Sequence, residues 1–156
     1  MPNKRFLDAA YDLETTEQVR AYYEAWSATY NSEIGDQNDY AQPSRCAEAL
    51  AAAINPNGAR VLDVGCGSGL SGLALRTVGF PEIDGCDLSP AMLELARRTG
   101  VYDHLFEADL NKGLTTPHRA YDAVAAVGVF SFGHLKATVL RDLLAVLKPG
   151  GVMVVG

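Results

Sequence analysis

The feature that most constrains this sequence is a short apolar run, residues 60–64, followed by three glycines set two residues apart. The run predicts a buried strand that ends in an acid, Asp63, and a valine. Glycine permits positive φ and has no Cβ, so residues 65–69 can turn sharply and let a ligand approach their backbone closely. The apolar segment 70–78 predicts a helix, whose first N–H groups have no partner within the helix. A strand, a glycine turn and a helix together indicate a nucleotide-type pocket.

Strand and helix signals alternate along the following residues. Further strands are expected at 83–87, 104–108, 121–129 and from 152, and further helices at 89–100, where Ser89 is the expected N-cap, and at 135–147. Short connections between alternating elements predict an α/β fold with a Rossmann-like, doubly wound parallel sheet and helices on both faces. Ligands of such sheets lie above the carboxyl ends of the strands.

The N-terminal part carries an aromatic helical pattern. A capping box at Thr15 and Gln18 precedes apolar residues at helical spacing that include Trp26 and Tyr30. This helix either packs on the domain edge or forms a lid whose two aromatic side chains cover a ligand. A second helix is expected from Pro43 to about residue 54. We assign residues 1–57 to an N-terminal helical lid segment and residues 58–156 to the core of one domain.

Composition limits the class of protein. The 156 residues suffice for one domain, and a net charge of −6 with a pI near 4.9 disfavours nucleic acid as a partner. The N-terminus lacks a secretory signal and the longest apolar run, 123–130, is too short to span a bilayer, so we expect a cytoplasmic protein without a membrane partner. The three cysteines are odd in number and lack histidine partners, which indicates buried thiols and no metal site.

Three acidic residues end successive predicted strands. Asp63 favours a ligand with a positive end, and Asp87 can accept hydrogen bonds from both hydroxyls of a ribose. Asp109 can accept from an exocyclic amine, with Leu110 and Met92 as apolar walls for a base. Together they describe an adenosine that carries an amino-acid tail and no phosphates.

An alternative pattern overlaps the glycine turn. Gly67, Gly69 and Gly72 satisfy G-x-G-x-x-G, the fingerprint of dinucleotide binding, which would suit a nicotinamide-dependent dehydrogenase. The acid at position 63 disfavours this interpretation, because an anion there would repel a pyrophosphate.

Four ordered motifs resemble those of class I S-adenosylmethionine-dependent methyltransferases: residues 61–69, 87–90, 108–110 and 147–151. The aromatic N-terminal part is similar to the branch that includes the Williams-Beuren-region methyltransferase. The resemblance implies S-adenosyl-L-methionine as cofactor, S-adenosyl-L-homocysteine as product, and aromatic lid residues near the cofactor. The implied cofactor-binding residues are Trp26, Tyr30, Asp63, Gly65, Cys66, Gly67, Asp87, Leu88, Met92, Asp109, Leu110 and Val127.

The resemblance also implies methyl transfer, in which an enzyme mainly aligns the reactants and excludes water. A general base is needed only for a protonated acceptor; His134 is the candidate, and its alternative role is to cap the next helix. The loop 128–134 lacks the signature of enzymes that methylate base amines, so with the acidic charge we expect a small-molecule acceptor. A cofactor-binding module without catalysis is the alternative.

The chain departs from the family at its C-terminal end. Family members have a seven-stranded sheet whose last two strands form an antiparallel hairpin, and no residues here supply that hairpin. We therefore expect either a truncated chain or a homodimer that covers the edge of the strand at 152–155.

Overall fold

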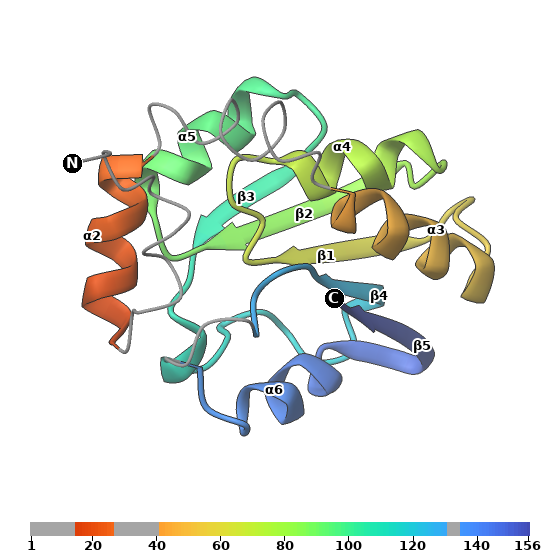
Figure 1. Cartoon of the computed structure of the whole chain (residues 1–156). Coiled ribbons are helices and arrows are strands. Elements are labelled where there is room, and N and C mark those ends of the chain that lie inside the picture. The colour runs from red at the N-terminus through yellow and green to blue at the C-terminus, as the bar shows by residue number, and fades with distance from the viewer. Residues whose placement is uncertain (1–14, 27–40, 131–134) are drawn as a thin grey trace.

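In the computed structural model, residues 15–26, 41–130 and 135–156 are described, and they form a parallel sheet of five strands with helices on both faces (Figure 1). The strands are β1 (Arg60–Val64), β2 (Glu82–Asp87), β3 (His104–Glu107), β4 (Tyr121–Ala126) and β5 (Leu147–Val155). Their order is β3-β2-β1-β4-β5, and every neighbouring pair is parallel. The sheet reverses its direction of winding between β3 and β4, which confirms the predicted doubly wound α/β fold.

Five helices lie among the described residues, and two of them begin at the capping residues that the sequence predicts. They are α2 (Thr16–Trp26), α3 (Gln42–Ala53), α4 (Leu70–Thr77), α5 (Pro90–Arg98) and α6 (Val139–Ala145), with a short 3-10 turn, η2 (Leu110–Lys112). The Ser89 hydroxyl accepts a hydrogen bond from the backbone N–H of Met92 at 3.2 Å and so caps α5. Thr15 and Gln18 exchange two backbone-to-side-chain bonds of 3.1 and 3.2 Å, which confirms the predicted capping box of α2.

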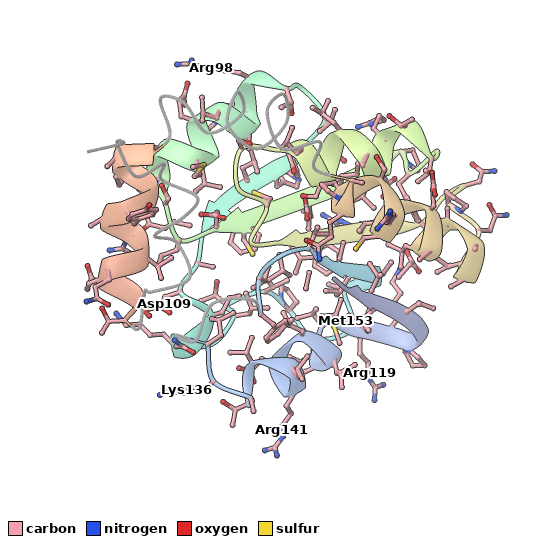
Figure 2. The ribbon with its side chains drawn as sticks, in the orientation of Figure 1. Arg98, Asp109, Arg119, Lys136, Arg141 and Met153 are labelled. Carbon is pink, nitrogen blue, oxygen red and sulfur yellow. The ribbon has the colours of Figure 1, made fainter. Side chains whose placement is uncertain are left out.

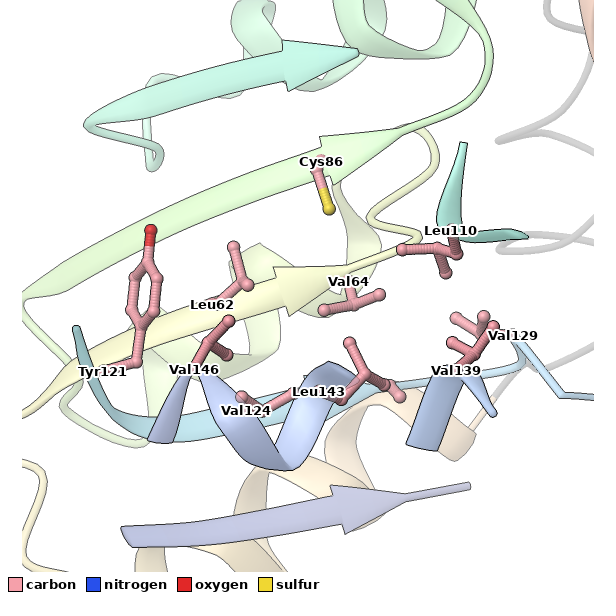
Figure 3. Packing of buried hydrophobic residues seen from close by; sticks show 11 residues of the cluster. Leu62, Val64, Cys86, Leu110, Tyr121, Val124, Val129, Val139, Leu143 and Val146 are labelled. Carbon is pink, nitrogen blue, oxygen red and sulfur yellow. The ribbon is translucent and has the colours of Figure 1, made fainter. Parts of the chain in front are cut away.

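Alternate residues of β1 build two separate cores. Leu62 and Val64 face α6, in the cluster that Figure 3 shows, where they meet Val124 and Leu143. On the opposite face, the cluster that contains Val61 also takes residues from α3 and α4. The central strands are buried on both faces, which is why β1 and β4 read as nearly continuous apolar runs.

Helix α2 lies beside the carboxyl ends of β2 and β3 (Figure 1). Arg20 donates to the carbonyl of Leu88 at 3.3 Å and to the carboxylate of Glu107 at 3.0 Å. Glu24 accepts from the Ser89 hydroxyl at 2.9 Å and from the backbone N–H of Ala91 at 3.2 Å. Polar contacts therefore place α2 over the ends of these strands.

Three predicted boundaries near the C-terminal end were wrong. Strand β4 ends at Ala126, not at residue 129, because Gly128 adopts a positive φ of 71°. Helix α6 is confined to Val139–Ala145, since the preceding residues form a turn. Strand β5 starts at Leu147, not Val152, because Gly150, with φ of 81°, produces an irregularity in register and not a break.

Helix α3 belongs to the proposed lid segment by sequence position, yet it contributes to the core. Ala47 and Leu50 are 1% exposed and join the buried cluster on the Val61 face. The boundary between residues 57 and 58 stays a prediction. Within the described ranges, no helix is long and apolar enough to cross a membrane.

Candidate cofactor site

The glycine turn between β1 and α4 forms one wall of a pocket. Gly65, Gly67 and Gly69 all have positive φ, at 62°, 54° and 101°. A Cβ at Gly65 would lie 2.5 Å from a methyl of Val129, so only glycine fits there. The pocket is lined by Pro43 of α3, residues 65–68 of the turn, Leu70 and Ser71 of α4, and Val127 after β4. The turn residues and Val127, all expected from the sequence, therefore meet at one site.

Asp63 lies behind this pocket and is 1% exposed. Its Oδ2 accepts hydrogen bonds from the hydroxyls of Ser71 and Tyr102, each at 2.7 Å. Its Oδ1 is buried and has no hydrogen-bond partner among the described residues, and no described cation forms an ion pair with it. Burial raises the pKa of this carboxyl to about 6, while the two hydroxyl donors lower it and Asp87 raises it. The site thus holds a buried negative charge that lacks a described counter-ion.

Ser71 connects this charge to the pocket. Its hydroxyl donates to Asp63 and the residue lines the pocket, so Oγ can act toward a ligand as a hydrogen-bond acceptor. An acceptor backed by a carboxylate suits a cationic donor such as an ammonium group. Sequence reasoning missed Ser71, because a serine in the first turn of a helix carries no functional signal of its own.

Tyr102 explains part of the glycine pattern. A Cβ at Gly72 would lie 2.3 Å from the Tyr102 hydroxyl oxygen, and one at Gly85 would lie 2.8 Å from its ring. A Cβ at Gly69 would lie 2.9 Å from Thr99 and 3.4 Å from the same ring. Gly72 therefore makes room for a tyrosine, and the G-x-G-x-x-G match needs no pyrophosphate to explain it. This removes the main support for the dinucleotide alternative.

Asp87 joins two loops of the site. Its Oδ2 accepts from the backbone N–H of Gly67 at 3.0 Å, and its Oδ1 accepts from that of Ser89 at 2.9 Å. Burial raises the pKa of Asp87, while these backbone N–H groups oppose the rise. Each carboxylate oxygen has a lone pair left for a further donor, so the predicted ribose contact is compatible with both existing bonds.

The residues predicted to surround a base lie along β2, α5 and η2. Leu88 is partly buried, whereas Met92 is 0% exposed and Leu110 is 9% exposed. Asp109 lies near α2 at the same edge of the sheet (Figure 2), and its Oδ1 caps η2 by accepting from the backbone N–H of Asn111 at 3.1 Å. Their contacts with an adenine stay predictions.

Other predicted residues give less information. Cys66 is buried in the turn, and burial raises the pKa of its thiol well above the usual value, so it is a neutral packing residue. The backbone of Trp26 ends α2, and its side chain lies outside the description. Tyr30 and His134 lie outside the described residues, so the aromatic lid and the general base are untested.

A family model described as "Methyltransferase domain" matches residues 61–151 of the chain. The chain belongs to the class I S-adenosylmethionine-dependent methyltransferases. The site geometry agrees with this, because a glycine turn, a buried anion and a strand-end carboxylate suit the ammonium and ribose of the family's cofactor, S-adenosyl-L-methionine. Family membership accounts for the motifs of residues 58–156 and confirms the resemblance seen in the sequence.

The methyltransferase relatives are longer proteins than this chain. Human methyltransferase-like protein 27 is 34% identical over 148 residues, which are 93% of this chain and 60% of the relative. Trans-aconitate 2-methyltransferase of Methylobacterium radiotolerans is 42% identical over 96 residues, 60% of this chain and 36% of the relative. Ribosomal protein L11 methyltransferase of Burkholderia vietnamiensis is 34% identical over 108 residues, 68% of this chain and 34% of the relative.

One solved structure gives the same result for the fold. An S-adenosylmethionine-dependent methyltransferase from Mesorhizobium loti superposes with a TM-score of 0.57 at 28% identity, covering 69% of this chain and 51% of that chain. The methyltransferase core described above is therefore shared, while the chain spans about a third to three fifths of the length of these similar proteins.

Proposed function

We propose that this chain binds S-adenosyl-L-methionine and takes part in methyl transfer to a small-molecule acceptor. The observation that carries the proposal is the buried Asp63, with no described counter-ion, behind a pocket walled by the glycine turn. In this arrangement the ammonium of the cofactor binds near Ser71, and its ribose hydroxyls donate to Asp87. The predicted base contacts, Leu88, Met92, Asp109 and Leu110, lie farther along the same edge.

The bound cofactor supplies a methyl group on a sulfonium, which is a good electrophile without further activation. An acceptor atom forms the new bond to the methyl carbon while the sulfur–carbon bond breaks, and the sulfur keeps the electron pair. The chain's own residues orient the cofactor and exclude water from its amino-acid end. A proton lost by the acceptor passes to solvent or to His134, whose role as general base remains part of the proposal.

Surface charge supports a small acceptor. The chain carries a net charge of −6, and Arg98, Arg119, Lys136 and Arg141 project outward from separate elements (Figure 2). No basic cluster of the kind that binds nucleic acid is formed by these cations. The relatives act on different acceptors by their names, one on trans-aconitate and one on a ribosomal protein, so the acceptor class needs its own experiment.

Titration calorimetry with S-adenosyl-L-homocysteine tests the cofactor. We expect saturable binding by the wild-type chain and at least about tenfold weaker binding by Asp87→Asn, because hydrogen bonds to a charged group contribute roughly 1.5–3 kcal/mol. Asp122→Asn is the matched control: the same substitution at the start of β4, where Asp122 contacts Arg60 and Lys148. Absence of binding by folded wild-type chain, or binding of nicotinamide dinucleotide in its place, contradicts the proposal.

Transfer of a radiolabelled methyl group tests the acceptor. The chain is incubated with labelled S-adenosyl-L-methionine and with either the low-molecular-mass or the protein fraction of a cell extract. Label in small molecules supports the proposal, and label only in protein overturns the small-molecule part. Cofactor binding with no transfer to either fraction identifies the chain as a cofactor-binding module without catalysis.

We also propose that two copies associate through β5, which pairs with β4 on one side and lies at an edge of the described sheet. Size-exclusion chromatography with light scattering tests this, and a soluble monomer at high concentration contradicts it.

A further inference from the structure

Tyr102 reaches the cofactor site from a distant part of the chain. It lies between α5 and β3, 39 residues beyond Asp63, and its hydroxyl donates to the Asp63 carboxylate at 2.7 Å. Its ring occupies the space left by the missing side chains of Gly72 and Gly85. Tyr102 is not among the residues that line the pocket.

We propose that Tyr102 is a positioning residue of the cofactor site: its hydroxyl fixes the Asp63 carboxylate behind Ser71, so that recognition of the ligand's ammonium depends on a side chain outside the pocket. This inference rests on the proposed function and adds to it a residue that controls cofactor affinity. It also gives a reason for the glycines at positions 72 and 85, which provide the slot for the ring.

The hydrogen bonds of the Asp63 carboxylate support this role. Two hydroxyls, those of Ser71 and Tyr102, donate to the same oxygen, Oδ2, at equal distances of 2.7 Å. Two donors to one oxygen restrict the orientation of the carboxylate, and the Ser71 proton is directed at that oxygen. Without the Tyr102 hydroxyl, the carboxylate would keep one described donor and lose this constraint.

The hydrogen bond from Tyr102 also keeps Asp63 ionised, because it lowers the pKa of the carboxyl. Burial raises the pKa of Asp63 to about 6, and the Tyr102 and Ser71 hydrogen bonds limit the rise. Around it, the thiols of Cys66 and Cys86 and the phenol of Tyr102 have raised pKa values and stay neutral near pH 7. Asp87, whose pKa burial also raises, is the other acid whose charge acts on Asp63. Loss of the Tyr102 hydroxyl therefore makes Asp63 protonate at higher pH.

The test compares Tyr102→Phe with a matched control, Tyr121→Phe. Tyr121 also donates to a buried aspartate, Asp84, at 2.8 Å, but on the other face of the sheet. Affinity for S-adenosyl-L-homocysteine is measured by calorimetry at several values between pH 5 and 8. Tyr102→Phe keeps the ring in its glycine slot and removes only the hydroxyl, so the fold is retained.

For Tyr102→Phe we expect the pH at which affinity falls to half its maximum to rise by about one unit. A shift of about one pKa unit is the size expected when a carboxylate loses one charge-assisted hydrogen bond. The affinity should be about fivefold weaker near pH 6 and nearly unchanged at pH 8. Tyr121→Phe should follow the wild-type profile. Because Asp87 titrates in all three proteins, it does not produce the difference.

Two results overturn the inference. Uniform weakening at every pH would show that Tyr102 acts only through packing, and a profile identical to wild type would show that it has no role in binding. Absence of binding by the wild-type chain overturns the proposed function and this inference with it. Carbon-13 NMR titration of the ligand-free proteins gives a second readout: the Asp63 carboxyl must titrate at higher pH in Tyr102→Phe than in wild type.

Discussion

Two buried aspartates lie on neighbouring strands and opposite faces of the sheet. Asp63 of β1 shares its face with Val61 and accepts from Tyr102, whereas Asp84 of β2 lies on the face of the α6 core and accepts from Tyr121. The two tyrosine bonds, of 2.7 and 2.8 Å, are nearly equal in length. Each aspartate also has one buried oxygen without a hydrogen-bond partner among the described residues.

The difference between them is a cation. Asp84 forms an ion pair with the Arg60 guanidinium at 2.9 Å, and that guanidinium lies over the Tyr121 ring at 5.4 Å from its centroid. Asp63 has two neutral donors and no described cation. A buried charge that is paired within the protein serves the fold, whereas one left unpaired costs stability and suits a ligand that brings the opposite charge.

The largest expected effect on stability comes from Gly72, which lies against the Tyr102 hydroxyl on the Asp63 side of the comparison. Gly72→Ala would place a methyl 2.3 Å from the Tyr102 hydroxyl oxygen, and we expect it to lower the free energy of unfolding by about 3 kcal/mol or more. Urea denaturation at pH 7 measures the effect. In a Tyr102→Leu background Gly72→Ala should lower the free energy of unfolding by less than about 1 kcal/mol, because the tyrosine ring and hydroxyl that the methyl would overlap are absent. Equal costs in both backgrounds would refute the role of Gly72 as space for the ring.

The next effect concerns the unpaired charge of Asp63. Its folded pKa of about 6 lies above the ordinary aspartate value of 3.8, so the folded state binds the proton more tightly. The stability gained from protonating Asp63 is present below about pH 4 and is lost as pH rises through 6. Asp63→Asn lacks this titration, so its stability relative to wild type should rise by up to about 3 kcal/mol between pH 4 and 7.5. Parallel stability curves across this range would contradict a raised pKa.

The smallest effect concerns the paired charge of Asp84. Arg60→Met should lower the free energy of unfolding by about 2 kcal/mol, less than the usual cost of breaking a buried pair because the Arg60 side chain is 41% exposed. Arg97→Met is the matched control: its partner Glu94 is 54% exposed, and we expect a change below about 0.5 kcal/mol. Similar costs for the two variants in urea denaturation at pH 7 would remove the distinction between a structural and a functional aspartate.

Much of the fold could be predicted because it depends on local signals. Alternating apolar runs, the Ser89 cap and the glycine turn each act within a few residues, and all appear where expected. The boundaries of β4 and β5 could not be predicted, because glycine adopts positive or negative φ with similar ease and the sequence does not show that Gly128 and Gly150 take positive values.

The site was predictable in part for the same reason. Asp63 and Asp87 stand next to recognisable strand ends, so their placement followed from the sequence. Tyr102 could not be connected with Asp63, since 39 residues separate them and only the packed sheet brings them together. The polar contacts that place α2 could not be predicted either, because Arg20 and Glu24 are ordinary charged residues of a helix and their partners lie more than 60 residues away.

The bonds of Asp87 have a mechanical consequence. One carboxylate holds the backbone of the loop after β1 through Gly67 and that of the loop after β2 through Ser89. Asp87 therefore connects the two loops, next to the backbone bond from the Cys66 N–H to the Cys86 carbonyl at 2.9 Å. In the proposed complex the ribose would contact the same carboxylate that holds both loops, so a change of side-chain length at this position should disturb the two loops together.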